Sequence, residues 1–87
     1  MKVSLLEQKF DLDKLLYKIN MFEMIEDKYP NYVVMSERTV DAIENQYGVY
    51  YVEKNIYFKH NKRYIGEIFG IPIAYNDNLQ FGTVDIV

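Results

Sequence analysis

The 87-residue chain has no cysteine and no tryptophan, one histidine, two prolines and four glycines. Without cysteine it forms no disulfide framework, no cysteine-ligated zinc site and no thiol nucleophile. A single histidine excludes metal sites built from several histidines. The longest uncharged stretch, residues 68–76, is far shorter than the roughly 20 apolar residues of a membrane helix. Glu7 also interrupts the apolar start of the chain, so we expect neither a signal peptide nor a membrane span.

The composition is that of a folded protein. Hydrophobic residues make up 49% of the chain and charged residues 26%, which is typical of globular domains and not of disordered chains. The general scaling of protein surface with size predicts that about 64% of the surface of such a chain is buried on folding. This is enough for one core and too little for two, so we expect a single domain over residues 1–87.

The first half of the chain predicts two helices. A stripe of apolar residues recurs at steps of three or four: Leu12, Leu15, Leu16, Ile19, Phe22, Ile25 and Tyr29. We expect this helix, over residues 12–29, to have Asp11 or Asp13 as its N-cap and to be stopped by Pro30. Ser36 is the expected N-cap of a second helix over residues 37–47, with Gly48 as its left-handed terminal residue.

Beyond Gly48 the apolar period changes from 3.6 to 2, as in strands. After an earlier buried strand at 32–35, strands are expected at 49–52, 56–59, 63–69, 71–75 and 83–87. The second and third of these would form a hairpin around residues 60–62. Pro72 lacks an N–H group and so belongs on an edge strand or at a strand start. Together these elements predict an α+β fold in which two helices pack on a small, largely antiparallel sheet.

No segment carries a catalytic or cofactor-binding motif. Gly66 and Gly70 are not followed by the Gly-Lys-Ser/Thr of a phosphate-binding loop. Glu23, Glu26 and Asp27 lie about one helical turn apart, a spacing that fits a solvated helix face better than a carboxylate metal site. We therefore expect a protein that is not an enzyme and binds neither a cofactor nor a metal.

The charge is distributed unevenly along a chain of net charge −3, because residues 49–66 hold four bases and one acid. Bases among aromatic residues are what single-stranded nucleic-acid binders use, so the hairpin over residues 54–64 is a candidate interface. Its candidate interaction residues, with the neighbouring strand, are Tyr50, Tyr57, Lys59, His60, Lys62, Arg63 and Tyr64. The acidic net charge favours the simpler interpretation, in which the lysines solvate a hairpin whose aromatics partly face the core.

The nine tyrosines and five phenylalanines also suit a protein-binding surface. Tyrosine buries a large area at low entropic cost and is enriched at protein interfaces. We expect a protein partner or self-association, with nucleic acid as the less favoured partner and no membrane partner.

Several short motifs follow one another in an informative order. Residues 30–36 read Pro-Asn-Tyr-Val-Val-Met-Ser, then come Thr39 and Gly-Val-Tyr-Tyr at 48–51. Phe-Gly-Ile-Pro-Ile at 69–73, Asp77, Leu79 and Gly-Thr at 82–83 complete the series. This order resembles the axial-domain segment of tailed-phage major capsid proteins and of encapsulins, and it covers about two thirds of the chain. In that family a strand ending in a pair such as Met-Ser precedes a short helix, and a Gly-aliphatic-Pro-aliphatic strand comes later.

The resemblance implies a capsid-like structural or assembly module, encoded by a phage or prophage and acting in the cytoplasm of the infected bacterium or in the virion. The long spine helix, extended loop and N-terminal arm of that family do not fit in 87 residues, so this chain alone is not expected to tile a shell. We expect a non-catalytic protein that acts by protein–protein interaction. Two alternatives stay open: an inhibitor of a host defence system, and a single-stranded nucleic-acid binder acting through the hairpin over residues 54–64.

Overall fold

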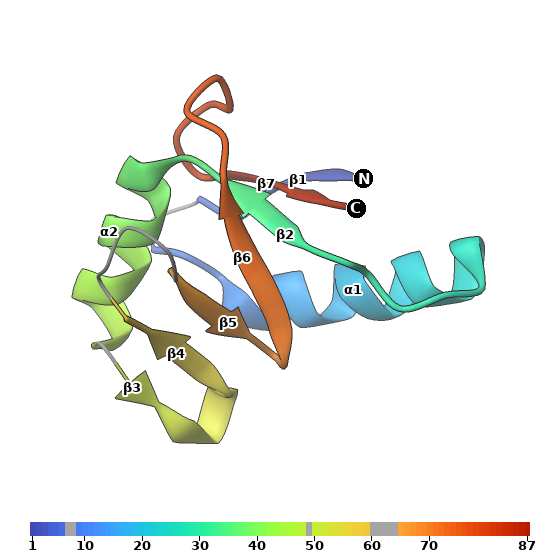
Figure 1. The fold of residues 1–87 in the computed structure, drawn as a ribbon, viewed down its shortest axis with the longest axis horizontal. Coiled ribbons are helices and arrows are strands. Elements are labelled where there is room, and N and C mark those ends of the chain that lie inside the picture. Colours follow the sequence, from blue (N-terminus) through green and yellow to red (C-terminus); the bar gives the residue numbers. More distant parts are fainter. Residues whose placement is uncertain (7–8, 49, 60–64) are drawn as a thin grey trace.

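The computed structural model describes residues 1–6, 9–48, 50–59 and 65–87 (Figure 1). Its elements, in chain order, are β1 (Lys2–Ser4), α1 (Leu12–Glu26), β2 (Val33–Met35), α2 (Glu37–Tyr47), β3 (Tyr50–Tyr51), the 3-10 turn η1 (Val52–Lys54), β4 (Ile56–Phe58), β5 (Gly66–Ile68), β6 (Ile71–Tyr75) and β7 (Thr83–Ile86). Over these described ranges the predicted fold class is confirmed: two helices accompany a largely antiparallel sheet.

The strands form one sheet in the order β1-β7-β2-β6-β5-β4-β3. Neighbouring strands run antiparallel except for β2 and β6, which are parallel, with Val33 opposite Ile73 and Met35 opposite Tyr75. A parallel pair requires a long crossover connection, and here α2 together with β3, β4 and β5 supplies it. The parallel pair therefore brings two segments far apart in sequence together in the middle of the sheet.

One face of this sheet is largely buried from β1 to β4. The strand register aligns these buried side chains on it: Val3, Val84, Ile86, Val33, Met35, Ile71, Ile73, Ile68, Ile56 and Phe58. Tyr75, opposite Met35 on the same face, is 41% exposed. Both helices cover this face, because the buried residues of α1 and of α2 join the same hydrophobic core. The opposite face carries half-buried or exposed side chains such as Tyr57, Glu67 and Pro72.

Helix α2 begins and ends where the sequence predicts. The Ser36 hydroxyl accepts a hydrogen bond from the backbone N–H of Thr39 at 3.3 Å, and the two hydroxyl oxygens lie 2.8 Å apart. The Asp77 carboxylate accepts from the backbone N–H of Glu37 at 2.9 Å. These contacts satisfy N–H groups that have no partner inside the first helical turn. At the other end Gly48, with φ of 84°, follows the last helical residue.

Helix α1 ends earlier than the sequence predicts. Asp11 is its N-cap, as expected, and accepts from the backbone N–H of Lys14 at 3.0 Å. The helix stops at Glu26 and not near Tyr29, because Asp27 adopts a left-handed conformation with φ of 54°. A short polar side chain such as aspartate tolerates this conformation better than most residues do. The helix therefore ends before Pro30 is reached.

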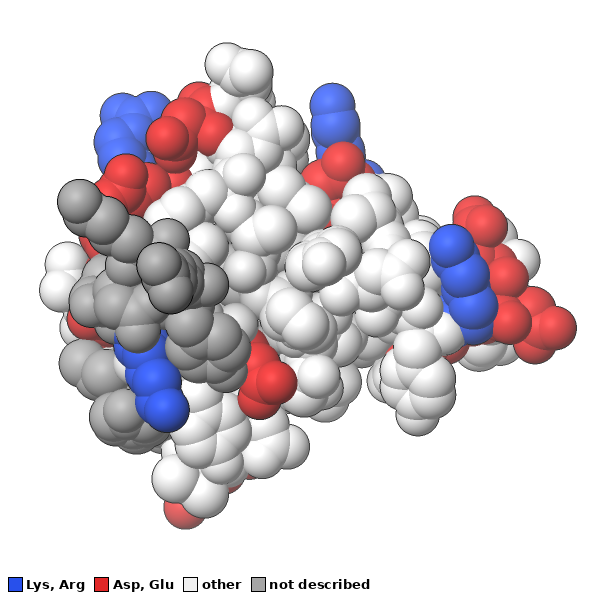
Figure 2. All heavy atoms as spheres, in the orientation of Figure 1, with Lys and Arg blue, Asp and Glu red and all other residues white. Residues whose placement is uncertain are grey.

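The single apolar stripe predicted for this helix is also wrong in part. Leu12, Leu15, Ile19 and Phe22 are buried, as expected. Leu16, Ile25 and Tyr29 are 39%, 64% and 77% exposed. The C-terminal turns of α1 project beyond the sheet (Figure 1), and charged side chains of both signs gather at the tip of this projection (Figure 2). Ile25 and Tyr29, at the end of the predicted stripe, consequently lie beyond the core.

Two strand predictions are corrected as well. Within the predicted strand 49–52, Val52 already belongs to the turn η1. The sequence predicts Pro72 on an edge strand or at a strand start; it is the second residue of β6, which is a central strand, so the strand start is confirmed and the edge is not. β5 and β6 form a hairpin with a two-residue turn. In such a hairpin the pair next to the turn, here Ile68 and Ile71, exchanges backbone hydrogen bonds, and the following pair, Glu67 and Pro72, does not. The nitrogen of Pro72 therefore points away from β5. Because β2 pairs with β6 only from Ile73 onward, Pro72 breaks no ladder bond. The predicted turn at 60–62 lies outside the described residues.

Gly66 allows two strands to approach more closely than a side chain would permit. It lies opposite Phe58 with φ of 146°, and a Cβ atom there would be 1.8 Å from the carbonyl oxygen of Tyr57. We expect Gly66→Ala to lower the free energy of unfolding by at least about 3 kcal/mol, since a backbone clash adds to backbone strain. Urea unfolding measures this loss.

Gly70→Ala is the matched control. Gly70 has φ of 78°, but a Cβ atom there meets nothing within 4 Å. Only the left-handed strain remains, so the loss should be about 1 kcal/mol. Equal losses for the two variants would contradict the close approach at Gly66.

Candidate functional site

Most of the predicted interaction residues lie outside the described part of the chain. These are His60, Lys62, Arg63 and Tyr64. Tyr50 lies in β3 opposite Tyr57 of β4. Tyr57 is half-buried on the sheet face away from the helices, and Lys59 follows β4 as an exposed residue.

One base of the predicted nucleic-acid interface contacts an acid of the first helix. The Nζ atom of Lys54 lies 2.7 Å from Oδ1 of Asp13, which joins η1 to the first turn of α1. This ion pair offsets part of the positive charge that would attract phosphate. Phe58, an aromatic of the same segment, is fully buried and presents no ring for base stacking. The described contacts of this segment therefore favour a structural role.

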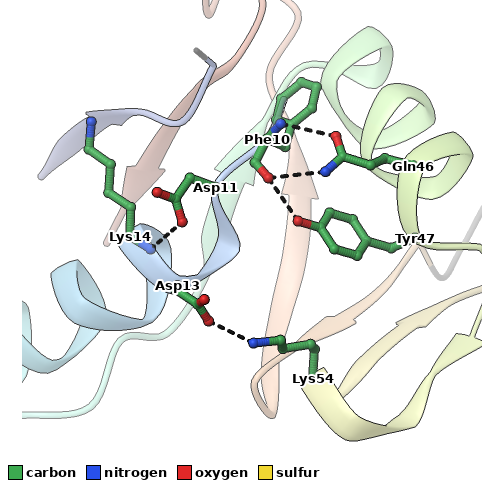
Figure 3. Close-up of polar contacts among 7 residues, drawn as sticks. All are labelled: Phe10, Asp11, Asp13, Lys14, Gln46, Tyr47 and Lys54. Atoms are coloured by element: carbon green, nitrogen blue, oxygen red, sulfur yellow. Dashed lines mark hydrogen bonds and ion pairs between the residues drawn. The ribbon is translucent and has the colours of Figure 1, made fainter. Parts of the chain in front are cut away.

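A polar cleft of about 790 Å³ lies between the start of α1, the end of α2 and η1. Its size falls within the range of small-molecule sites, roughly 300–1,000 Å³. Figure 3 shows Gln46 and Tyr47 of α2 pointing toward the backbone of Phe10, while Lys54 reaches toward Asp13. The cleft is therefore a candidate for a small-molecule binding site.

The side chains of Gln46 and Tyr47 bind the backbone of Phe10. The N–H of Phe10 donates to Oε1 of Gln46 at 3.0 Å, and Nε2 of Gln46 donates back to the Phe10 carbonyl at 3.2 Å. The Tyr47 hydroxyl donates to the same carbonyl at 2.8 Å. The Phe10 ring is buried and meets the ring of Phe81 edge-on, with 5.7 Å between their centroids. These contacts attach the segment before α1 to the last turn of α2.

The tyrosine and the two aspartates of the cleft also serve the fold. Burial raises the pKa of the Tyr47 hydroxyl; a hydrogen bond with Gln46 opposes this, and the charges of Asp11 and Asp13 add to the rise. The phenol therefore stays protonated at neutral pH and acts as a donor, not as a base. Asp11 caps α1 and Asp13 pairs with Lys54. The arrangement is that of a joint between helices.

A second candidate site is the side of α1 that faces away from the core. Tyr17, Met21, Met24 and Ile25 follow at positions i, i+4, i+7 and i+8, so they lie along one side of the helix, roughly opposite its buried residues. Tyr17 is 62%, Met24 83% and Ile25 64% exposed. We call these four residues the outer stripe of α1. Tyr29 lies beyond the helix end and lines a hollow with Glu23 and Asp27.

The outer stripe was missed from the sequence, although its spacing is visible there. The single stripe predicted for this segment leaves out Tyr17, Met21 and Met24. Two apolar stripes on opposite sides of one helix are the signal that would have revealed it. A surface helix normally presents polar residues to solvent, so this feature of α1 calls for an explanation.

A groove of about 580 Å³ adjoins the same helix. It is lined by Met1, Phe22, Glu26, Lys28, Asn31, Tyr32, Pro72, Ile86 and Val87. The amino terminus lies beside it, where the Met1 ammonium group contacts Asp85 at 3.1 Å and donates to the carbonyl of Ile86 at 2.8 Å. The groove therefore lies where the projecting part of α1 meets the two ends of the chain.

The described ranges also bear on metal binding and on membrane spanning. Among them no group of three or more His, Asp or Glu side chains is arranged to hold a metal ion. None of their helices is both long and apolar enough to cross a membrane.

Comparisons with known proteins give no match: neither a family model, nor a curated protein, nor a solved structure corresponds to this chain. The capsid resemblance therefore depends on the motifs within residues 30–83 and stays a prediction.

The hydrogen bonds to Phe10 are expected to contribute more stability than the ion pair beside them. Gln46→Ala should lower the free energy of unfolding by about 1–2 kcal/mol, because it leaves the N–H of Phe10 without its acceptor. Asp13→Asn should cost only about 0.5 kcal/mol, since the Asp13 side chain is 77% exposed and its pair with Lys54 is screened by water. Urea unfolding of both variants tests this order, and a larger loss for Asp13→Asn would contradict it.

Proposed function

We propose that this protein is a non-catalytic binding module that acts by contact with another protein chain through the outer stripe of α1. The observation that carries the proposal is that α1 has apolar residues on two opposite sides, of which the fold buries one. A surface helix normally presents polar residues on the side opposite its buried residues. A protein partner supplies the cover that the chain itself does not give to Tyr17, Met24 and Ile25.

The size and composition of the outer stripe support this role. A tyrosine side chain presents about 150–250 Å² when fully exposed, so the stripe offers on the order of 500 Å² of surface. The largest apolar patch of a typical monomer measures about 300–600 Å² and often marks an interaction site. Tyrosine and methionine are enriched at interfaces, and methionine adapts its shape to a partner.

A capsid-like structural role is the form of this function that the order of motifs suggests. The motif at residues 30–36 covers β2 and the N-cap of α2, and the motif at 69–73 covers a hairpin turn and the start of β6. Strand, short helix and later strand thus follow in the order that the resemblance implies. The described contacts give no comparable support to a nucleic-acid binder, because Lys54 contacts Asp13.

The contact surface is tested by charge substitution. Ile25→Asp should remove the protein from its complex in cells of its natural host, because a buried carboxylate without a partner is strongly unfavourable. Val52→Asp is the matched control, since Val52 is 66% exposed, close to the 64% of Ile25, but lies on η1. Tagged full-length chains are recovered from those cells and sized by gel filtration.

The wild type and Val52→Asp should elute in the complex, and Ile25→Asp as a monomer of unchanged helical content by circular dichroism. A wild type that elutes alone would contradict the proposal. Retention of Ile25→Asp in the complex would place the contact elsewhere on the molecule.

The capsid-like role makes a separate prediction. If the protein is a structural or assembly component, it should co-purify with phage particles or their precursors in a fixed ratio to the major capsid protein. Quantitative mass spectrometry of gradient-purified particles measures that ratio. Absence from both mature particles and precursors would overturn the structural role and leave protein binding in place.

A further inference from the structure

We infer that Met24 is a site of reversible oxidation, at which peroxide converts the thioether to a sulfoxide and thereby releases the partner of the outer stripe. This inference rests on the proposed function, because it names a regulation of the same surface. Oxidation turns the flexible apolar side chain of methionine into a polar one and disrupts interfaces built on methionine, and reductases reverse the change.

The four methionines of the chain differ widely in exposure. Met24 is 83% exposed, the highest value among the exposed large hydrophobic residues of the described ranges. Met35, at the end of β2, is fully buried. Met1 and Met21 are half-buried, and Met1 packs against the core. An oxidant dissolved in water therefore reaches the sulfur of Met24 more readily than that of the other three.

The reaction requires only the thioether and the oxidant. A lone pair on Sδ of Met24 attacks one oxygen of hydrogen peroxide, and the O–O bond breaks as the S–O bond forms. The departing hydroxide takes the proton from the transferred oxygen and leaves as water. Sulfur loses two electrons and the peroxide gains them, so the product is an uncharged, polar sulfoxide.

The fold does not depend on the side chain of Met24. The buried residues of α1 lie on the other side of the helix and end at Phe22. The last turns of the helix, which include Met24, project beyond the sheet (Figure 1). Oxidation of Met24 therefore leaves the core intact, whereas a sulfoxide at Met35 would place a polar group inside it.

The contact with a partner depends on this side chain much more. Met24 and Ile25 form one end of the outer stripe and are its most exposed members. A partner that covers the stripe removes both side chains from water. A sulfoxide oxygen buried there without a hydrogen-bond donor is unfavourable, so we expect oxidation to weaken the complex by at least about tenfold.

The purified full-length chain tests the site of oxidation. It is treated with hydrogen peroxide, and peptide mass spectrometry follows the addition of one oxygen atom at each methionine. Met24 should react fastest and Met35 at least about tenfold more slowly, because its sulfur is reached only when the sheet opens. In urea the two rates should become similar. Oxidation of Met21 or Met35 as fast as that of Met24 in the folded chain would overturn the assignment.

Release of the partner is tested with two matched variants. Met24→Leu keeps the apolar bulk and removes the thioether, and Met21→Leu does the same one turn earlier. Each tagged chain is treated with peroxide and then with catalase. It is next added to a desalted extract of its natural host in which this gene is deleted, and sized by gel filtration.

Treated wild type and treated Met21→Leu should elute as monomers, whereas treated Met24→Leu should elute in the complex. Methionine sulfoxide reductases with a dithiol should return the wild type to the complex. The dithiol supplies two electrons and becomes a disulfide, while the sulfoxide oxygen leaves as water.

The outcomes separate this inference from the proposed function. An untreated wild type that enters the complex, and still enters it with Met24 oxidised, overturns the release and leaves protein binding in place. Release of treated Met24→Leu overturns the role of Met24. An untreated wild type that elutes alone overturns the proposed function and the release with it, whereas the mass spectra of the purified chain still decide the site of oxidation.

Discussion

The burial of one face of the sheet, from β1 to β4, is the constraint on which the rest of this structure depends. Strand register aligns the side chains from Val3 at one edge to Phe58 near the other, and both helices must lie on that side to cover them. Two further features follow from it. Gly66 lets β4 and β5 approach closely enough to continue the buried face. The two faces of the sheet therefore differ in burial, and Tyr57 and Glu67 lie half-buried on the face away from the helices.

The polar joint at Phe10 holds the two helices in place on that face. Hydrophobic burial is strong but not directional, so it does not by itself set how the start of α1 lies against the end of α2. The hydrogen bonds of Gln46 and Tyr47 with the backbone N–H and carbonyl of Phe10 supply the direction. The nearby ion pair of Asp13 and Lys54 is more exposed and adds less. A cleft of ligand size is thereby explained as part of the scaffold.

The helix that completes the core is also the one best placed to meet another chain. Its buried residues end at Phe22, yet the helix continues to Glu26 and projects beyond the sheet (Figure 1). The outer stripe begins on the packed part of α1 and continues onto this projection, on the side away from the buried residues, so a partner can reach it without displacing a strand. A partner packed on the stripe would give the helix apolar neighbours on both sides.

Local patterns determined the parts of the structure that depend on neighbouring residues. The α+β class, the Ser36 cap, the limits of α2 and the Asp11 cap all follow from short-range hydrogen bonding and periodicity, and the structure confirms them. The early end of α1 at Asp27 does not follow from periodicity, because a left-handed residue leaves the apolar spacing of Ile25 and Tyr29 intact.

Tertiary structure decided which apolar residues are core. The predicted stripe holds both Leu15 and Ile25, but the sheet covers one side of α1 and ends before its last turn, so the first is buried and the second is exposed. The same holds for Pro72, which lies in a central strand because β2 pairs with β6 only beyond it. Residue type and spacing thus set the elements, whereas the length of the sheet relative to α1 set the surface that the protein presents to a partner.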